Sequence, residues 1–199
     1  MRRLSQEPTV RVMRMRSSHS VQKVACGVPE NFSTHNYSNY PLTILSRAGN
    51  TATIMALIII SGLPCSGRST RATELVKDFE RRIASSSTSP ALASISRIEI
   101  VSDATVHNAK GCYSTQRLEK PARASYLSAV TRSIGKDCIT VADGGAGLNI
   151  KGFRYQLWCA AREEGVRCVS VQVHAPPEIC KQWNQSRRAR EEESYDDDT

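Results

Sequence analysis

A glycine loop between an apolar run and an amphipathic stretch constrains this 199-residue chain more than any other feature. Residues 56–61 read ALIIIS, a β-branched run typical of a strand buried on both faces of a sheet. Residues 62–70 read GLPCSGRST, which is loop chemistry, and apolar residues then recur at helical spacing until SSSTSP begins at Ser85. This order of strand, glycine loop and helix is the setting of a phosphate-binding loop.

The alternation of strand and helix continues along the chain. Further strands are predicted at residues 97–102, 138–142 and 167–174, and helices at residues 69–84, 116–134, 151–164 and from Pro176 onward. Such a chain forms an α/β fold with a mostly parallel sheet and helices on both faces. The aromatic content of 6% fits an aliphatic core better than an aromatic-rich sandwich.

The composition excludes several classes of protein. The longest apolar run, residues 55–60, is far shorter than the roughly 20 residues of a membrane-spanning helix, so we expect no membrane association. Seven cysteines without a Cys-x-x-Cys pair, and four scattered histidines, favour a reduced intracellular protein without a metal centre made by these residues. The formal net charge of +8 permits contact with a polyanion without requiring it.

The two ends lack the periodicity of the middle. Residues 1–54 are predicted to be disordered, and an upstream start in the gene model would explain this extension, because Met55 directly precedes the first strand. Its arginines resemble a mitochondrial presequence, but Glu7 and Pro8 interrupt an amphipathic helix, which argues against mitochondrial targeting. Residues 188–199, a basic cluster and then an acidic block, are predicted to be a disordered tail. Residues 55–187 are therefore the predicted folded domain.

The glycine loop supplies the candidate nucleotide site. The pattern G-x-x-x-x-G-K-[ST] is matched by Gly62, Gly67 and Ser69, with Arg68 at the lysine position. Backbone N–H groups and the helix N-terminus would bind ATP phosphates, and the Ser69 hydroxyl would bind Mg²⁺. The predicted nucleotide-binding residues are Gly62, Leu63, Pro64, Cys65, Ser66, Gly67, Arg68, Ser69 and Thr70. The alternative is a strand-to-helix turn that binds no phosphate.

Two aspartates end predicted strands. Asp143 follows residues 138–142, the position at which a Walker B carboxylate holds the water shell of Mg²⁺. We therefore assign Asp143 and Arg68 as candidate catalytic residues. Asp103 follows residues 97–102 and is a weaker candidate for positioning a nucleophile or metal. Either aspartate could instead form a turn or cap a helix.

Four segments together give the chain a family resemblance. They are GLPCSGRSTRA (residues 62–72), SAVTR (128–132), IKGFRYQLWCAARE (150–163) and CKQWN (180–184). They resemble the Elongator-associated P-loop ATPase family, which is named after killer-toxin-insensitive protein twelve. Its sister family is the kinase that phosphorylates seryl-tRNA for selenocysteine synthesis. The resemblance runs from Met55 to about Arg187 and implies a kinase-like P-loop NTPase fold.

The resemblance also implies a function. Family members bind ATP and Mg²⁺, work with the Elongator complex in modifying the wobble uridine of tRNA, and hydrolyse ATP under stimulation by tRNA. The implied location is the cytoplasm, with the nucleus as a second site. Lys151, Arg154 and Tyr155 lie in the matching IKGFRY stretch and are candidates for contact with phosphate or tRNA. The alternative for these three is an ordinary basic helix surface.

Three departures from the family modify these expectations. Arg68 replaces a lysine, so we expect nucleotide binding with weak or no hydrolysis. Residues 144–149, GGAGLN, are longer than the family's connection, and their glycines are expected to loosen the site. The chain stops where family members continue into a helical tRNA-binding half, through a truncated gene model or a shortened paralogue, so tRNA binding is expected to be weak and salt-dependent. A kinase acting on a small molecule or seryl-tRNA, and a non-hydrolysing interaction module, remain open alternatives.

Overall fold

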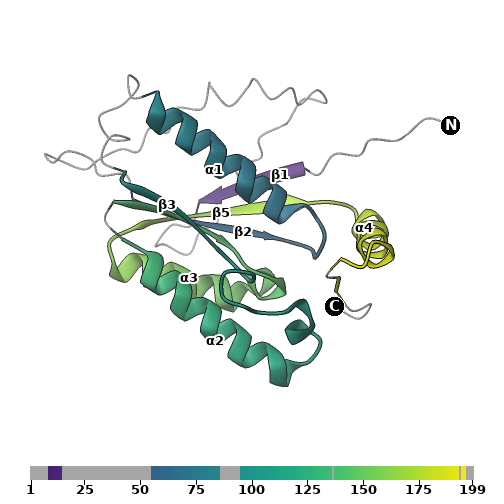
Figure 1. Ribbon diagram of the computed structural model, residues 1–199. Coiled ribbons are helices and arrows are strands. Elements are labelled where there is room, and N and C mark those ends of the chain that lie inside the picture. The colour runs from purple at the N-terminus through teal and green to yellow at the C-terminus, as the bar shows by residue number, and fades with distance from the viewer. Residues whose placement is uncertain (1–8, 15–54, 86–94, 136, 193, 196–199) are drawn as a thin grey trace, which may run out of the picture.

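A central sheet organises the computed structural model, which describes residues 9–14, 55–85, 95–135, 137–192 and 194–195. The sheet has five strands in the order β1-β5-β2-β4-β3 (Figure 1). The strands are β1 (Thr9–Arg14), β2 (Ala56–Gly62), β3 (Arg97–Ser102), β4 (Cys138–Asp143) and β5 (Arg167–His174). Strands β2 to β5 run parallel, and β1 is antiparallel to β5. The mostly parallel α/β sheet predicted from the alternation is confirmed.

Helices cover both faces of this sheet, as predicted. Helix α1 (Arg68–Ala84) lies on one face, and α2 (Gln116–Ser133) and α3 (Lys151–Glu163) lie on the other (Figure 1). Helix α4 (Pro177–Ala189) lies beyond the carboxyl end of β5. Two short 3-10 helices, η2 (Lys110–Tyr113) and η3 (Ala146–Asn149), were not predicted. Both follow strands at the carboxyl edge of the sheet, where the connections build the candidate site.

The alternating side chains of β2 separate two cores. Leu57 and Ile59 are fully buried and belong to the cluster under α2 and α3 that contains Tyr126. Ile58 and Ile60 belong to the cluster under α1. Because successive side chains of a strand point to opposite faces, one β-branched run fills both layers. Burial on both faces fixes β2, and therefore fixes the start of the glycine loop at Gly62.

The sheet edge beside β5 differs from the prediction that residues 1–54 are disordered. Residues 9–14 form β1, so the prediction of disorder is wrong for them, while residues 1–8 and 15–54 lie outside the described part of the chain. Strand β1 pairs with β5 from Thr9 opposite His174 to Arg14 opposite Val169. An edge strand offers a row of backbone donors and acceptors to any extended segment. The sequence does not show which edge is open, and this is why β1 was missed.

The C-terminal segment differs from a second prediction. Helix α4 continues to Ala189, and Tyr195 is buried, with 7% of its surface exposed. The prediction of a disordered tail is therefore wrong for residues 188–189 and for Tyr195, while residues 193 and 196–199 lie outside the described part. A helix propagates through charged residues as long as it gains backbone hydrogen bonds, so the charge block did not mark its end.

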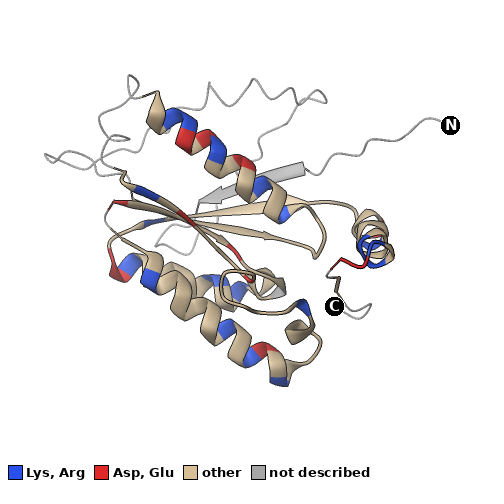
Figure 2. Cartoon of the chain, in the orientation of Figure 1, with Lys and Arg blue, Asp and Glu red and all other residues tan. Residues whose placement is uncertain are grey.

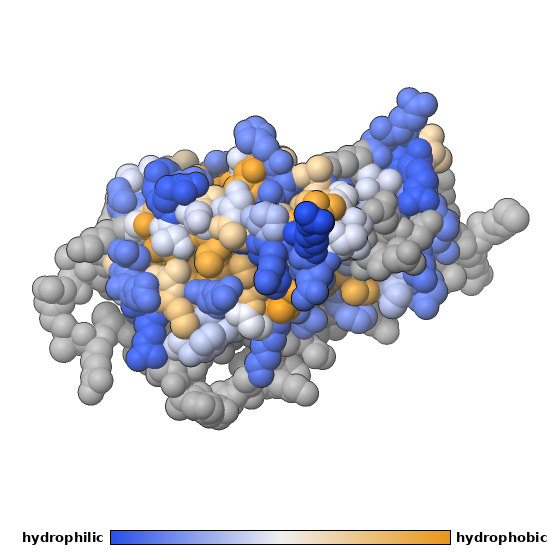
Figure 3. All heavy atoms as spheres, turned by 90° about the horizontal axis from the view of Figure 1, so that it is seen from below, coloured by the Kyte–Doolittle hydropathy of each residue, from blue (hydrophilic) through white to orange (hydrophobic). Residues whose placement is uncertain are grey.

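The described residues also bear on membrane-spanning helices, cysteines and metal-binding groups. No helix among them is long and apolar enough to cross a membrane. The face formed by α2 and α3 mixes hydrophilic and apolar side chains (Figure 3). The six described cysteines are free thiols, and the described residues contain no group of three or more His, Cys, Asp or Glu side chains able to hold a metal.

Candidate functional site

The loop from β2 to α1 has a backbone that only certain residues tolerate. Gly62 has φ of +153°, Cys65 of +57° and Gly67 of +87°. A Cβ atom added to Gly62 would lie 2.3 Å from the carbonyl oxygen of Val173 in β5. Gly62 is therefore required both by its conformation and by the close approach of β5. The glycine spacing found in the sequence specifies the tight turn that a phosphate-binding loop needs.

The same loop presents unused donors at the start of α1. The Ser66 hydroxyl is buried and has no hydrogen-bond partner among the described residues. The Ser66 N–H donates to the Leu63 carbonyl at 3.1 Å and closes the turn. Ser69 and Thr70 are exposed in the first turn of α1, which contains no acidic residue. A helix N-terminus with free N–H groups favours an anion, so the loop has the polarity that a phosphate requires.

Asp143 stands beside this helix start. It is the last residue of β4, which pairs with β2, and it is 7% exposed. Burial raises the pKa of the Asp143 carboxyl, and a hydrogen bond from the Ser69 side chain and the charge of Arg68 oppose the shift. The structure thus brings together Ser69 and Asp143, the two residues predicted for Mg²⁺. A hydroxyl paired with a carboxylate at a strand end fits a hydrated magnesium ion.

The Arg68 side chain contacts the turn that follows Asp143. It is buried, and Nη1 donates to the carbonyl oxygens of Gly144 at 3.0 Å and Gly145 at 2.7 Å. Nη2 lies 3.4 Å from the hydroxyl of Tyr195. The guanidinium therefore joins α1 to the turn after Asp143. A catalytic role for Arg68 on bound phosphates stays a prediction.

Asp103 belongs to the same edge of the sheet. It follows β3, and its carboxylate accepts a hydrogen bond of 2.6 Å from the Tyr113 hydroxyl and others from Asn108 and the backbone of Gly145. Burial raises the pKa of Asp103, and these hydrogen bonds oppose the shift. The weaker of the two carboxylate candidates therefore also lies at the site, where it is half-buried, whereas Asp143 is buried.

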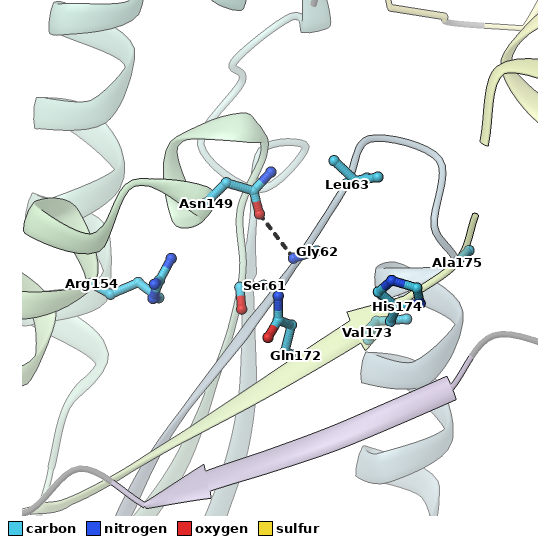
Figure 4. A pocket seen from close by; sticks show the side chains of 9 residues that line it. All are labelled: Ser61, Gly62, Leu63, Asn149, Arg154, Gln172, Val173, His174 and Ala175. Carbon is cyan, nitrogen blue, oxygen red and sulfur yellow. Dashed lines mark hydrogen bonds between the residues drawn. The ribbon is translucent and has the colours of Figure 1, made fainter. Parts of the chain in front are cut away.

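The turn after β4 differs from its prediction. A Cβ atom on Gly144 would lie 2.4 Å from the Tyr126 ring, and one on Gly145 would lie 2.2 Å from an oxygen of Asp103. These glycines allow close packing, so the expectation that they loosen the site is wrong. The turn also supports the glycine loop, because Asn149 Oδ1 accepts the Gly62 N–H at 2.9 Å (Figure 4).

The predicted basic contacts divide into two kinds. Lys151 is exposed at the first position of α3. Arg154 is half-buried, burial lowers its pKa, and its Nη1 donates to the Leu148 carbonyl at 2.7 Å. Arg154 and Asn149 face His174 across a cavity of about 240 Å³ beside Gly62 (Figure 4). Tyr155 is exposed and stacks on Trp158 with ring centroids 5.4 Å apart.

Sequence reasoning missed Asn184 and Tyr195. The Asn184 Oδ1 atom accepts the Tyr195 N–H at 3.0 Å, and its Nδ2 donates to the Tyr195 carbonyl at 2.9 Å. The Cys65 thiol also points to Asn184 Oδ1 at 3.5 Å. Asn184 thus connects α4, the glycine loop and the C-terminal segment. The signal for Asn184 was its place in the CKQWN segment, and the signal for Tyr195 was a single aromatic residue within a charged block.

Comparison with known proteins gives consistent matches over the same region. The family described as chromatin associated protein KTI12 matches residues 55–199. The KTI12 homolog of Arabidopsis thaliana is 35% identical over 145 residues, which are 72% of this chain and 44% of that protein. Kti12 of Schizosaccharomyces pombe is also 35% identical over 145 residues, 72% of this chain and 48% of that protein. The chain thus spans about half the length of the curated relatives it matches.

Solved structures give similar results. The crystal structure of Chaetomium thermophilum Kti12 in complex with ADP-AlF3 has a TM-score of 0.59 and 34% sequence identity, and the match covers 71% of this chain and 74% of that one. An APS kinase of Mycobacterium tuberculosis, solved with AMPPNP and APS, has a TM-score of 0.50 and 13% identity over 72% of this chain and 83% of that one. The second similarity concerns the fold alone, which is that of the P-loop kinases.

Proposed function

The chain belongs to the KTI12 family, and from this premise we propose that it is an ATP-binding regulatory protein of Elongator-dependent tRNA wobble-uridine modification. The observation that supports nucleotide binding most directly is the contact between Ser69 and Asp143, at the point where the glycine loop enters α1. In this arrangement a phosphate-binding turn and a metal-binding carboxylate come from neighbouring strands. The Elongator and tRNA parts of the proposal rest on the family resemblance.

The loop would hold the phosphates through its backbone. Gly62 and Gly67 give the chain its left-handed turns, Ser66 supplies an unused buried hydroxyl, and the first turn of α1 supplies free N–H groups. The ADP-AlF3 bound to the Chaetomium relative, at 34% identity, supports the same ligand class for this chain. ATP is therefore the proposed nucleotide.

Mg²⁺ is the proposed metal. Ser69 would bind it through its hydroxyl, and Asp143 would hold its water shell. When bound, the ion neutralises charge on the β- and γ-phosphates. Asp143 must be ionised for this role, and its burial opposes ionisation until a cation is present.

Hydrolysis is proposed to be slow and stimulated by tRNA. The Arg68 guanidinium is committed to two carbonyl oxygens, whereas phosphoryl transfer depends on positive charge placed at the γ-phosphate. This contact also favours the alternative of a non-hydrolysing, nucleotide-binding interaction module. No contact of the described residues specifically favours the other alternative, a kinase acting on a small molecule or seryl-tRNA.

Contact with tRNA is proposed for the basic surface near the site. Lys151 is exposed, so it can reach a backbone phosphate, whereas Arg154 would first have to release Leu148. Along α1 basic and acidic residues interleave, whereas basic residues gather at the end of α4 (Figure 2). Binding by so few cations is expected to be weak and to fall steeply with salt. Elongator in the cytoplasm, and in the nucleus, is the proposed partner.

One assay separates the three candidate functions. The full chain is incubated with Mg-ATP alone, with tRNA, and with seryl-tRNA, and both released phosphate and phosphoryl transfer are measured. The proposal expects slow phosphate release that rises with tRNA and no transfer. Transfer to seryl-tRNA would support the kinase, and binding of ATP without release under any condition would support the non-hydrolysing module.

A further inference from the structure

Tyr195 is a buried aromatic residue that the proposed function does not use. Only 7% of its surface is exposed, although it belongs to a charged segment. Asn184 binds both its backbone N–H and its carbonyl, and Arg188 Nη2 donates a second hydrogen bond to that carbonyl at 3.0 Å. We call these contacts of Asn184 and Arg188 the clamp. The clamp holds Tyr195 through its backbone, so it fixes the place of the side chain.

The side chain of Tyr195 lies among the charged groups of the site. Its hydroxyl is 3.4 Å from Arg68 Nη2, and the Lys110 ammonium lies 5.5 Å from the centroid of its ring. Burial raises the pKa of Tyr195, and the negative charges of Asp103 and Asp143 raise it further while Arg68 lowers it. The neutral phenol therefore stands between two cations, the Arg68 guanidinium and the Lys110 ammonium.

The clamp is also connected to the loop itself. The Asn184 Oδ1 atom that accepts the Tyr195 N–H also lies 3.5 Å from the Cys65 thiol, and Cys65 has the left-handed backbone of the turn. A movement of the loop at Cys65 would therefore disturb Asn184 Oδ1, the atom that accepts the Tyr195 N–H. Both contacts are made by a residue of helix α4.

We propose that Tyr195 is a removable plug of the nucleotide site, and that it and the phosphates of a bound nucleotide exclude each other. This inference rests on the proposed nucleotide binding. Nη1 of Arg68 is held by two carbonyl oxygens, but Nη2 makes only a long contact with a neutral phenol, and a phosphate would offer Nη2 a shorter, charge-assisted hydrogen bond. Nucleotide therefore displaces the plug, and the apparent affinity is lowered by the fraction of molecules in which the plug is seated.

The first test compares nucleotide affinity among variants of the full chain. Mg-ADP is titrated into the wild type, Tyr195→Ala, Tyr195→Phe and the control Leu118→Ala, which alters a half-exposed side chain on α2. We expect Tyr195→Ala to bind about tenfold more tightly, Tyr195→Phe to bind a few-fold more tightly, and the control to equal the wild type. Thermal unfolding without nucleotide checks that each variant is folded, and Tyr195→Phe keeps the test valid if Tyr195→Ala is not.

Equal affinity of the wild type and both Tyr195 variants would overturn the plug while leaving nucleotide binding intact. Absence of binding in every variant would instead overturn the proposed function, and the plug with it. Weaker binding in Tyr195→Phe would show that the phenol assists the nucleotide and would also overturn exclusion.

Hydrogen exchange of the Tyr195 amide gives a second and independent test. This N–H donates to Asn184, so it is protected while the plug is seated. Saturating Mg-ADP is expected to raise its exchange rate at least several-fold, while protection in the β2 strand stays the same or rises. Unchanged or greater protection at Tyr195 in a nucleotide-saturated sample would show that both occupy the site together, and the proposal would fall.

Discussion

Two glycine-rich turns follow buried parallel strands, and their glycines serve opposite purposes. In residues 62–67, Gly62 and Gly67 adopt positive φ values, and a buried hydroxyl at Ser66 is left without a partner. In residues 144–149, Gly144 and Gly145 have no positive φ and are needed because an aromatic ring and a carboxylate pack directly against them. The first turn is shaped to receive a ligand, and the second is filled by the protein itself.

The comparison shows how the two turns depend on each other. The packed turn supplies Asn149 to the Gly62 N–H and two carbonyl oxygens to Arg68. It also follows Asp143 directly, so its close packing constrains the backbone beside that carboxylate. A glycine-rich sequence can therefore form either an open loop or a closely packed turn. Only the residues that contact each glycine distinguish the two.

The packed turn is expected to be the most sensitive to substitution. Gly144→Ala places a methyl group 2.4 Å from the buried Tyr126 ring and should lower the free energy of unfolding by about 3 kcal/mol. Urea unfolding measures this. The matched control is Gly152→Ala in α3, where a Cβ atom has no neighbour within 4 Å and alanine should stabilise the helix by about 0.5–1 kcal/mol. Equal effects of the two substitutions would contradict the packing role of Gly144.

The second effect concerns the carboxylate between the two turns. Asp143→Asn should weaken Mg-ATP binding by about 2 kcal/mol, roughly thirtyfold, because a charged partner of the hydrated metal is lost. Binding of ATP in the presence of EDTA should change little. Calorimetric titration with and without Mg²⁺ measures both. A similar loss under the two conditions would assign Asp143 a structural role.

The third effect concerns the residue that joins the two turns. Arg68→Lys should raise ATP turnover about tenfold, on the order of 1.4 kcal/mol in the barrier, because a lysine can leave the Gly144 and Gly145 carbonyls and reach the γ-phosphate. The lost hydrogen bonds should lower the free energy of unfolding by about 1 kcal/mol. Steady-state turnover and urea unfolding measure these. A wild type that already hydrolyses ATP as fast as the variant would show that arginine serves this site.

The smallest effect is a pH dependence. Burial raises the pKa of Asp143 in the folded state above its ordinary value of 3.8, so this carboxyl contributes stability below that value and loses the contribution as pH rises through the raised pKa. The asparagine variant has no such group. The unfolding free energy of Asp143→Asn minus that of the wild type should therefore increase as pH rises from about 4 and then level off. A difference that stays constant, or decreases, over this range would refute the raised pKa.

Local patterns predicted the features that depend on local chemistry. The glycine spacing gave the loop at Gly62 and Gly67 because its conformation is required within a few residues, and β-branched runs gave the parallel strands because each fills two cores. Remote contacts were not predictable. Tyr195 meets Arg68 across 127 positions of sequence, and the packing of Gly144 depends on Tyr126 in a different helix. Strand β1 required knowledge of an open sheet edge, which no local pattern contains.

Residues 62–70 are proposed to hold the β-phosphate of a nucleotide. Calorimetric titration of the full chain with Mg-ADP and with AMP tests it most directly, because the two ligands share the nucleoside and the α-phosphate. We expect Mg-ADP to bind about a hundredfold more tightly than AMP, the equivalent of one or two charge-assisted hydrogen bonds from the loop. AMP binding as tightly as Mg-ADP, or no binding of Mg-ADP, would contradict it.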